Sequence, residues 1–175
     1  MIHRSLAALA AAITLVAASA TTALPAHGLA TLVACPLGTQ TVTWSPGLTY
    51  VPQPTSLHIE GILASCVSAT DPALNNATFV INGSGTGSCL TSSFPNATMV
   101  VDWNDGPDSV ITYDLTVNIK PAGETVFVSV GQVDSGQFAG GDVVRTTAEV
   151  TLDLAACLTT GLNSSSGPTS LTVTG

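Results

Sequence analysis

The chain has 175 residues, of which only 8% are charged, and its 11 Asp and Glu residues outnumber its 3 Lys and Arg residues. Nucleic acids and anionic membrane surfaces are bound through Lys and Arg, so a formal net charge of −8 argues against both as partners. A hydrophobic content of 45% excludes a disordered chain, and the length suits one domain.

The N-terminus has the pattern of an export signal. His3 and Arg4 precede an apolar run, Leu6–Ala18, and Ala18-Ser19-Ala20 supplies the small residues that a signal peptidase requires. The run is too short for a membrane span, and no later stretch approaches one. We therefore expect a signal peptide over residues 1–20 and a single secreted domain over residues 21–175.

Four cysteines in an exported chain predict two disulfides. Spacing alone leaves three pairings open. A hairpin between Thr41–Trp44 and Leu57–Leu63 would place Cys35 opposite Cys66, which favours that pair and leaves Cys89 for Cys157. As an alternative, Leu32-Val33-Ala34-Cys35 is similar to a lipobox, which would make the protein lipid-anchored at Cys35.

Alternating apolar and polar residues indicate strands along the remaining chain. The clearest is Ile111–Ile119, where every second residue is apolar. The glycine-rich run Asn82–Gly87 is interpreted as a flexible turn or bulge, and Leu154–Leu162 suits either a helical turn or a strand. Turn residues separate the segments, which predicts an all-β fold, an antiparallel β-sandwich or jelly roll of about eight strands. The predicted strands are Thr41–Trp44, Leu57–Leu63, Thr78–Ile81, Ala97–Trp103, Ile111–Ile119, Val126–Val130, Val144–Leu152 and Ser170–Thr174.

Several short motifs occur in an order that resembles small secreted actinobacterial all-β proteins of unknown function. They are Ser45–Thr49 with Pro52-Gln53, Asp102–Gly106, Gly136–Gly140 and Leu152–Leu162. The resemblance implies export and a single domain, and it supplies no catalytic residues to transfer.

Candidate catalytic groups are few. His58 is expected on the outer face of a strand beside Glu60, but no G-x-S-x-G motif provides a nucleophile for a Ser-His-acid hydrolase. Asp102 and Asp114 lie on adjacent predicted strands and could cleave glycosides only if they faced one another across a cleft. Tyr50, in a proline-flanked loop, is the aromatic most suited to exposure. We predict no catalytic residues.

The densest group of oxygen donors is Asp102, Asn104, Asp105 and Asp108, a weak calcium candidate. Its spacing is one residue short of the EF-hand register, and it lacks the closing Glu. An Asp-Gly hairpin turn explains the same residues without a metal. We therefore predict no cofactor and no metal.

These observations favour a secreted, non-enzymatic structural or interaction module outside the cell or at its surface, with an extracellular protein or glycan as the possible partner. The alternatives are a small carboxylate-dependent hydrolase and a protease inhibitor that presents Cys35–Gly38. A functional site is expected in the loops around Tyr50, Gly83–Cys89 or Asp134–Gly141.

Overall fold

A computed structural model describes residues 29–118, 124–150 and 155–175. The predicted signal peptide and the predicted turn at Pro121 lie outside these ranges. The described chain contains ten strands and one short 3₁₀ helix. Their bounds are β1 Thr31–Cys35, β2 Leu37–Leu48, β3 Gln53–Ala64, β4 Val67–Ser68, β5 Asn76–Gly87, β6 Thr91–Trp103, β7 Ser109–Asn118, β8 Glu124–Gly136, β9 Asp142–Val150, η1 Ala156–Leu158 and β10 Leu162–Thr174.

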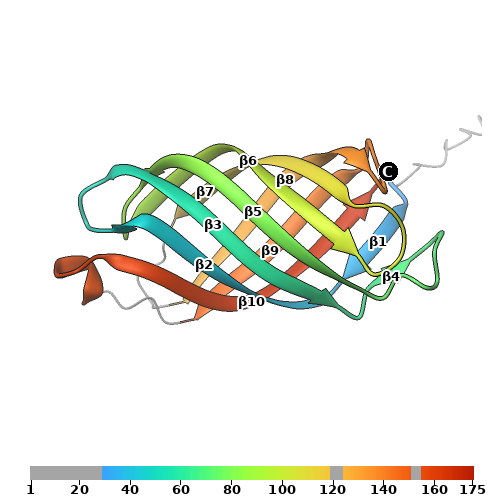
Figure 1. The fold of residues 1–175 in the computed structure, drawn as a ribbon, viewed down its shortest axis with the longest axis horizontal. Coiled ribbons are helices and arrows are strands. Elements are labelled where there is room, and N and C mark those ends of the chain that lie inside the picture. The colour runs from blue at the N-terminus through green and yellow to red at the C-terminus, as the bar shows by residue number, and fades with distance from the viewer. Residues whose placement is uncertain (1–28, 119–123, 151–154) are drawn as a thin grey trace, which may run out of the picture.

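The strands form one antiparallel sheet that closes on itself. Its order is β2-β3-β5-β6-β7-β8-β9-β10, and β10 then pairs with β2, from Leu162 opposite Leu48 to Pro168 opposite Thr39. Figure 1 shows the resulting elongated barrel, with strands inclined to its long axis. The all-β class and the two disulfides are confirmed. The sandwich or jelly roll was wrong, because the sheet is an eight-stranded barrel.

The closing strand explains this difference. Sequence patterning placed the last strand at Ser170–Thr174 and assigned the Ser- and Gly-rich segment before it to a loop. In the structure β10 begins at Leu162, and this segment pairs with β2. Ser and Gly weaken a strand signal, yet a backbone ladder does not require apolar side chains.

Strands β1 and β2 form one strand interrupted at Pro36. Both pair with β10, with Cys35 opposite Leu171 and Thr39 opposite Pro168. Proline lacks the N–H that a ladder requires, so the pairing breaks there. The two-residue β4 pairs with β1, and neither β1 nor β4 was predicted.

The barrel interior is packed with apolar side chains. Many of the largest fully buried residues lie on the neighbouring strands β3, β5, β6 and β7, and their side chains fill the inside of the barrel, as expected for eight strands. They include Phe79, Phe94, Leu63, Ile81, Met99 and Ile111. Phe138 packs edge-on against Trp103 with ring centroids 5.5 Å apart.

The glycine-rich run belongs to a strand. β5 continues through it to Gly87, fully paired with β3, and only the pairing with β6 shifts register between Asn82 and Thr86. The bulge was therefore correct and the flexible turn was wrong. Glycine is suited to such a site, because Ser93 O lies 2.0 Å from where a Cβ on Gly85 would stand.

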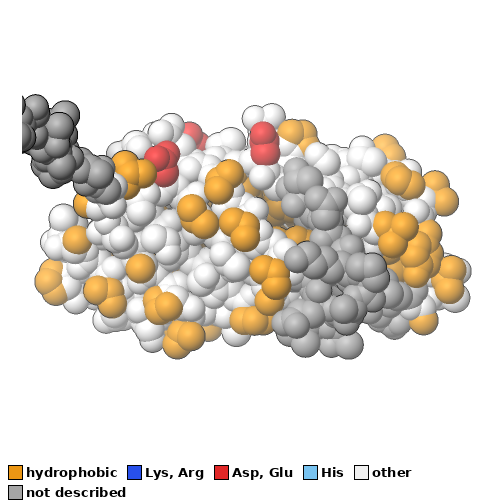
Figure 2. Space-filling view, turned by 180° about the vertical axis from the view of Figure 1, so that it is seen from behind, with side chains coloured by type: hydrophobic (Ala, Val, Ile, Leu, Met, Phe, Trp, Pro, Cys, Tyr) orange, Lys and Arg blue, Asp and Glu red, His pale blue; other side chains and the backbone are white. Residues whose placement is uncertain are grey.

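Strands β8 and β9 place their valines outside. Val128 and Val130 are 61% and 62% exposed. In contrast, Arg145 and Glu149 point inward and are only 2% and 4% exposed. Figure 2 shows hydrophobic side chains interspersed with polar ones on the described part of this face, without a visible Lys or Arg. Since Arg145 is buried, the described outer surface carries no Lys or Arg.

Two disulfides fasten the barrel. Cys35 bonds to Cys66 and Cys89 bonds to Cys157, which are the two pairs that the sequence favoured. The second bond ties the β5–β6 connection to η1. The segment Leu154–Leu162, which suited either a helical turn or a strand, thus contains a helical turn and ends at the first residue of β10. A sulfur in a disulfide cannot also carry a thioether lipid, so the lipid-anchored alternative at Cys35 is incompatible with this pairing. In the described ranges, no helix is both long and apolar enough to cross a membrane.

Candidate functional site

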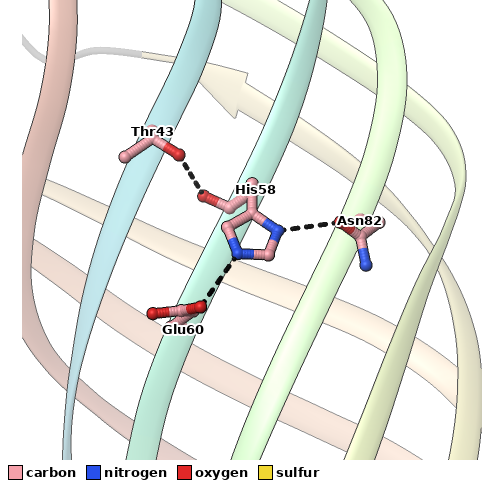
Figure 3. Close-up of polar contacts among 4 residues, drawn as sticks. All are labelled: Thr43, His58, Glu60 and Asn82. Carbon is pink, nitrogen blue, oxygen red and sulfur yellow. Dashed lines mark hydrogen bonds and ion pairs between the residues drawn. The ribbon is translucent and has the colours of Figure 1, made fainter.

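Polar side chains of three neighbouring strands meet on the outside of the barrel. His58 and Glu60 lie on β3, two residues apart and therefore on the same face, and His58 stands opposite Asn82 of β5 and Thr43 of β2. Leu57 and Ile59, which alternate with them, are buried in the core. Burial of these apolar residues therefore forces the polar set outward (Figure 3).

Both nitrogens of the His58 ring are engaged. Nδ1 lies 2.8 Å from Asn82 Oδ1, and Nε2 lies 3.2 Å from Glu60 Oε1. These are acceptor oxygens, and only the protonated ring can donate to both. The hydrogen bond to Asn82, followed by the one to Glu60, therefore raises the pKa of His58.

This arrangement is unsuited to general base catalysis. A catalytic histidine needs one nitrogen lone pair directed at the group whose proton it removes. Here each nitrogen already faces an oxygen acceptor, and neither faces a serine hydroxyl. The two contacts hold the imidazole in a fixed orientation on the surface.

The His58 cluster borders a groove of about 600 Å³ between β2, β3, β5 and the start of the β6 bulge. Hydroxyl and amide groups dominate its outward-facing lining, and Pro95 adds apolar contact. Groups of this kind hydrogen-bond polar ligands without requiring a charge on them. The polar lining residues are Thr43, Ser45, Ser56, His58, Asn82, Ser84 and Asn96.

A second polar site lies inside the barrel. Arg145 of β9 reaches the middle of the interior, where its Nη2 donates to Gln40 Oε1 and its guanidinium lies 5.5 Å from the centroid of the Phe79 ring. Its Nε has no hydrogen-bond partner within the described parts of the chain. Burial lowers the pKa of Arg145, although nearby Tyr113 and Glu149 oppose this effect.

Two further titratable groups share the interior. Burial raises the pKa of Glu149, and Ser165 and Arg145 counteract this only in part. Burial also raises the pKa of Tyr113 to about 12. The Tyr113 hydroxyl lies near the guanidinium but makes no hydrogen bond of good geometry. Arg145 and Glu149 line one small cavity, together with Gln40 and Thr147.

The carboxylates proposed for glycoside cleavage do not meet. Asp114 of β7 lies opposite Asn96 of β6, whose backbone N–H donates to Asp114 Oδ1 at 2.9 Å. Asp102 lies six residues further along β6, which corresponds to about 20 Å at 3.3 Å per residue. Glycosidases require carboxyl groups about 5 to 9.5 Å apart. Asp114 instead stabilises the backbone of the β6 bulge.

The weak calcium candidate does not form one cluster, because the Asn104 side chain is engaged in other hydrogen bonds. Asn104 Oδ1 accepts from the backbone N–H groups of Asn75 and Asn76, at 2.8 and 3.0 Å, and its amide donates to Ala73 O. Its oxygen is therefore directed at the β3–β5 connection. Asp102, Asp105 and Asp108 are exposed around the turn, and the described residues contain no group of three His, Cys, Asp or Glu side chains placed to hold a metal ion.

The loops expected to carry function are largely structural. Leu37 and Gly38 pair with Ala64 and Leu63, so the segment from Cys35 is part of the barrel wall and does not protrude as an inhibitor loop. Tyr50 is half-buried and packs against the core. The groove at His58 contains only one part of these loops, Gly83 and Ser84.

Comparison with known proteins does not assign the chain. No family model, curated protein or solved structure matches it. Function must therefore be argued from the geometry of this molecule.

Sequence reasoning found His58 and Glu60 and missed the interior pair. Arg145 and Glu149 belong to the polar half of an alternating strand, a pattern that ordinarily indicates a solvent-facing set. The sequence offers one hint. The other face of β8 and β9 is rich in valine, so alternation marks two distinct faces but does not decide which of them points into the barrel.

Proposed function

We propose that this protein is a secreted, non-enzymatic binding module that acts outside the cell and recognises a polar extracellular partner through the outer groove at His58. The observation that carries this proposal is the convergence of hydroxyl, amide and imidazole groups from β2, β3, β5 and β6 on one depression. The ring nitrogens of His58 are committed to Asn82 and Glu60, which favours recognition over catalysis.

The charge of the surface restricts the partner. The described outer surface lacks Lys and Arg, and the formal net charge of the chain is −8. Anionic polymers would be repelled, because like-charged surfaces disfavour encounter and binding. A neutral glycan suits the groove, since sugar hydroxyls match its hydroxyl and amide lining and an apolar sugar face can cover Pro95.

Binding to an array of neutral and anionic glycans, followed by titration of any glycan retained, tests this proposal. The double variant His58→Ala/Asn82→Ala should weaken binding about tenfold or more, equivalent to about 1.4 kcal/mol. The matched control Gln132→Ala/Asp134→Ala, on the outer face of β8, should change affinity less than twofold. The bound glycan should be recovered with unchanged mass.

Three outcomes contradict the proposal. They are failure to retain any neutral glycan, equal loss of binding in the groove and control variants, and recovery of a cleaved glycan. The last outcome would instead favour a hydrolase. If the wild-type chain retained a protein from culture supernatant and the groove variant did not, the groove would remain the binding site, but its partner would be a protein and not a glycan.

A further inference from the structure

The interior of the barrel contains a buried guanidinium without an ion-pair partner among the described residues. Arg145 is 2% exposed. No Asp or Glu side chain among the described residues lies within ion-pair distance of it, since the ion pair found in these ranges joins His58 to Glu60. A guanidinium carries five N–H donors. Among the described residues, Gln40 accepts a hydrogen bond from Arg145, and the Tyr113 hydroxyl lies nearby.

Such a group is costly to bury. An ionised side chain removed from water must be compensated by a partner of opposite charge or by hydrogen bonds. The neutral amide of Gln40 and the face of Phe79 compensate only in part, and the Nε–H is left unpaired. A guanidinium normally satisfies several donors at once with an oxyanion.

Space for such a partner lies beside Arg145. The cavity that it lines with Gln40 and Glu149 measures about 30 Å³, which is room for one or two water-sized groups. Most of its wall is apolar, for example Val42, Ile59 and Phe94. An apolar wall penalises a second negative charge, so a monovalent ion is favoured.

Glu149 does not occupy the role of counter-ion. It lies four residues from Arg145 on β9, a separation of about 13 Å between Cα atoms in an extended strand, with Thr147 between them. Burial raises the pKa of Glu149, and the nearby charge of Arg145 opposes this rise only in part.

We infer that the barrel cavity at Arg145 binds one small monovalent anion, of halide or formate size, through the guanidinium. This site lies inside the barrel, behind the wall whose outer face carries the groove, and it does not depend on the proposed glycan recognition.

Thermal unfolding of the purified chain in sodium chloride, sodium formate or sodium gluconate at matched ionic strength tests this inference. Gluconate is too large for the cavity and controls for general salt effects. Chloride or formate should raise Tm in a saturable manner, because a ligand present at a hundredfold excess over its Kd raises the folding constant about 100-fold. Equal responses to all three salts would overturn the inference.

Variants locate the effect. Arg145→Gln should abolish the anion-specific part of the Tm rise. Glu149→Gln should retain or strengthen it, and His58→Gln, which removes a cationic group from the outer surface, should leave it unchanged. If Arg145→Gln retains the full response, the site lies elsewhere and the inference fails.

The wild-type chain provides an independent check if Arg145→Gln does not fold. Crystals soaked in bromide should show an anomalous peak next to the Arg145 guanidinium. Loss of this peak on back-soaking in formate would show that carboxylate and halide share the site. Bromide peaks confined to the surface would contradict the inference.

Discussion

Gly61 faces the packed interior of the barrel, where a single added methyl group would collide with neighbouring atoms. It lies on β3 directly opposite Phe79 of β5. A Cβ placed on Gly61 would stand 2.4 Å from Phe79 Cζ and 2.6 Å from Thr39 O. The aromatic ring can move only by disturbing Arg145, whose guanidinium it faces, and the Thr39 carbonyl is part of the barrel wall. We therefore expect Gly61→Ala to destabilise the fold by about 1 to 3 kcal/mol, the usual cost of overpacking.

Urea unfolding followed by Trp fluorescence measures the loss of unfolding free energy. Thermal unfolding should show a decrease in Tm of about 2 to 4 °C per kcal/mol. Gly83→Ala on β5 is the matched control. Its added Cβ would approach Ala97 Cβ at 3.3 Å, a contact that small movements can relieve. A difference between the two variants smaller than about 0.5 kcal/mol would refute the packing argument.

Three further predictions concern charge and cross-links. The raised pKa of Glu149 means that its contribution to stability is present below about pH 4.5 and is lost as pH rises through its pKa in the folded state. Urea midpoints should therefore show Glu149→Gln to be more stable than wild type by about 1 kcal/mol at pH 7.5 and equally stable at pH 4. A variant less stable than wild type at pH 7.5 would contradict this prediction. The raised pKa of His58 gives stability that is present below about pH 6.5 and lost above its pKa in the folded state. Because the side chain is 45% exposed, the unfolding free energy of wild type should exceed that of His58→Gln by a few tenths of a kcal/mol at pH 5.5 and equal it at pH 8.5. A difference that grows with pH would be the opposite result. Replacing Cys89 and Cys157 by Ser opens a connection of 68 residues and should cost roughly 4 kcal/mol in chain entropy; an unchanged urea midpoint would show that this disulfide does not stabilise the fold.

The strands that could be predicted from the sequence have one apolar and one polar face. Val42 and Trp44, Ile111 and Tyr113 were expected to share core faces, and all are buried. Hydrophobic alternation therefore identified most of the strands. It could not establish closure, which depends on pairing between residues 162–168 and β2, where the side chains are mainly Ser, Gly and Thr.

Alternation does not show which face of β8 and β9 points into the barrel. Their valines are the more hydrophobic set, yet the structure turns Arg145, Thr147 and Glu149 inward. Successive side chains of a strand point to opposite faces, so turning the other face inward exchanges all the buried and exposed positions. The choice depends on what lies across the barrel, here Gln40 and Phe79, which are 66 to 105 residues away from Arg145 in sequence. For the same reason the interior site was missed, whereas the surface pair His58 and Glu60 was found.

The placement of both sites rests on closure of the barrel between β2 and β10. Amide hydrogen exchange combined with interstrand NOEs measures this pairing directly. We predict slow exchange along residues 39–43 and 164–168 and an NOE between the backbone protons of Val42 and Ser165, which lie opposite each other. Fast exchange along both segments without that NOE, as expected for the free edges of a sandwich, would contradict the account.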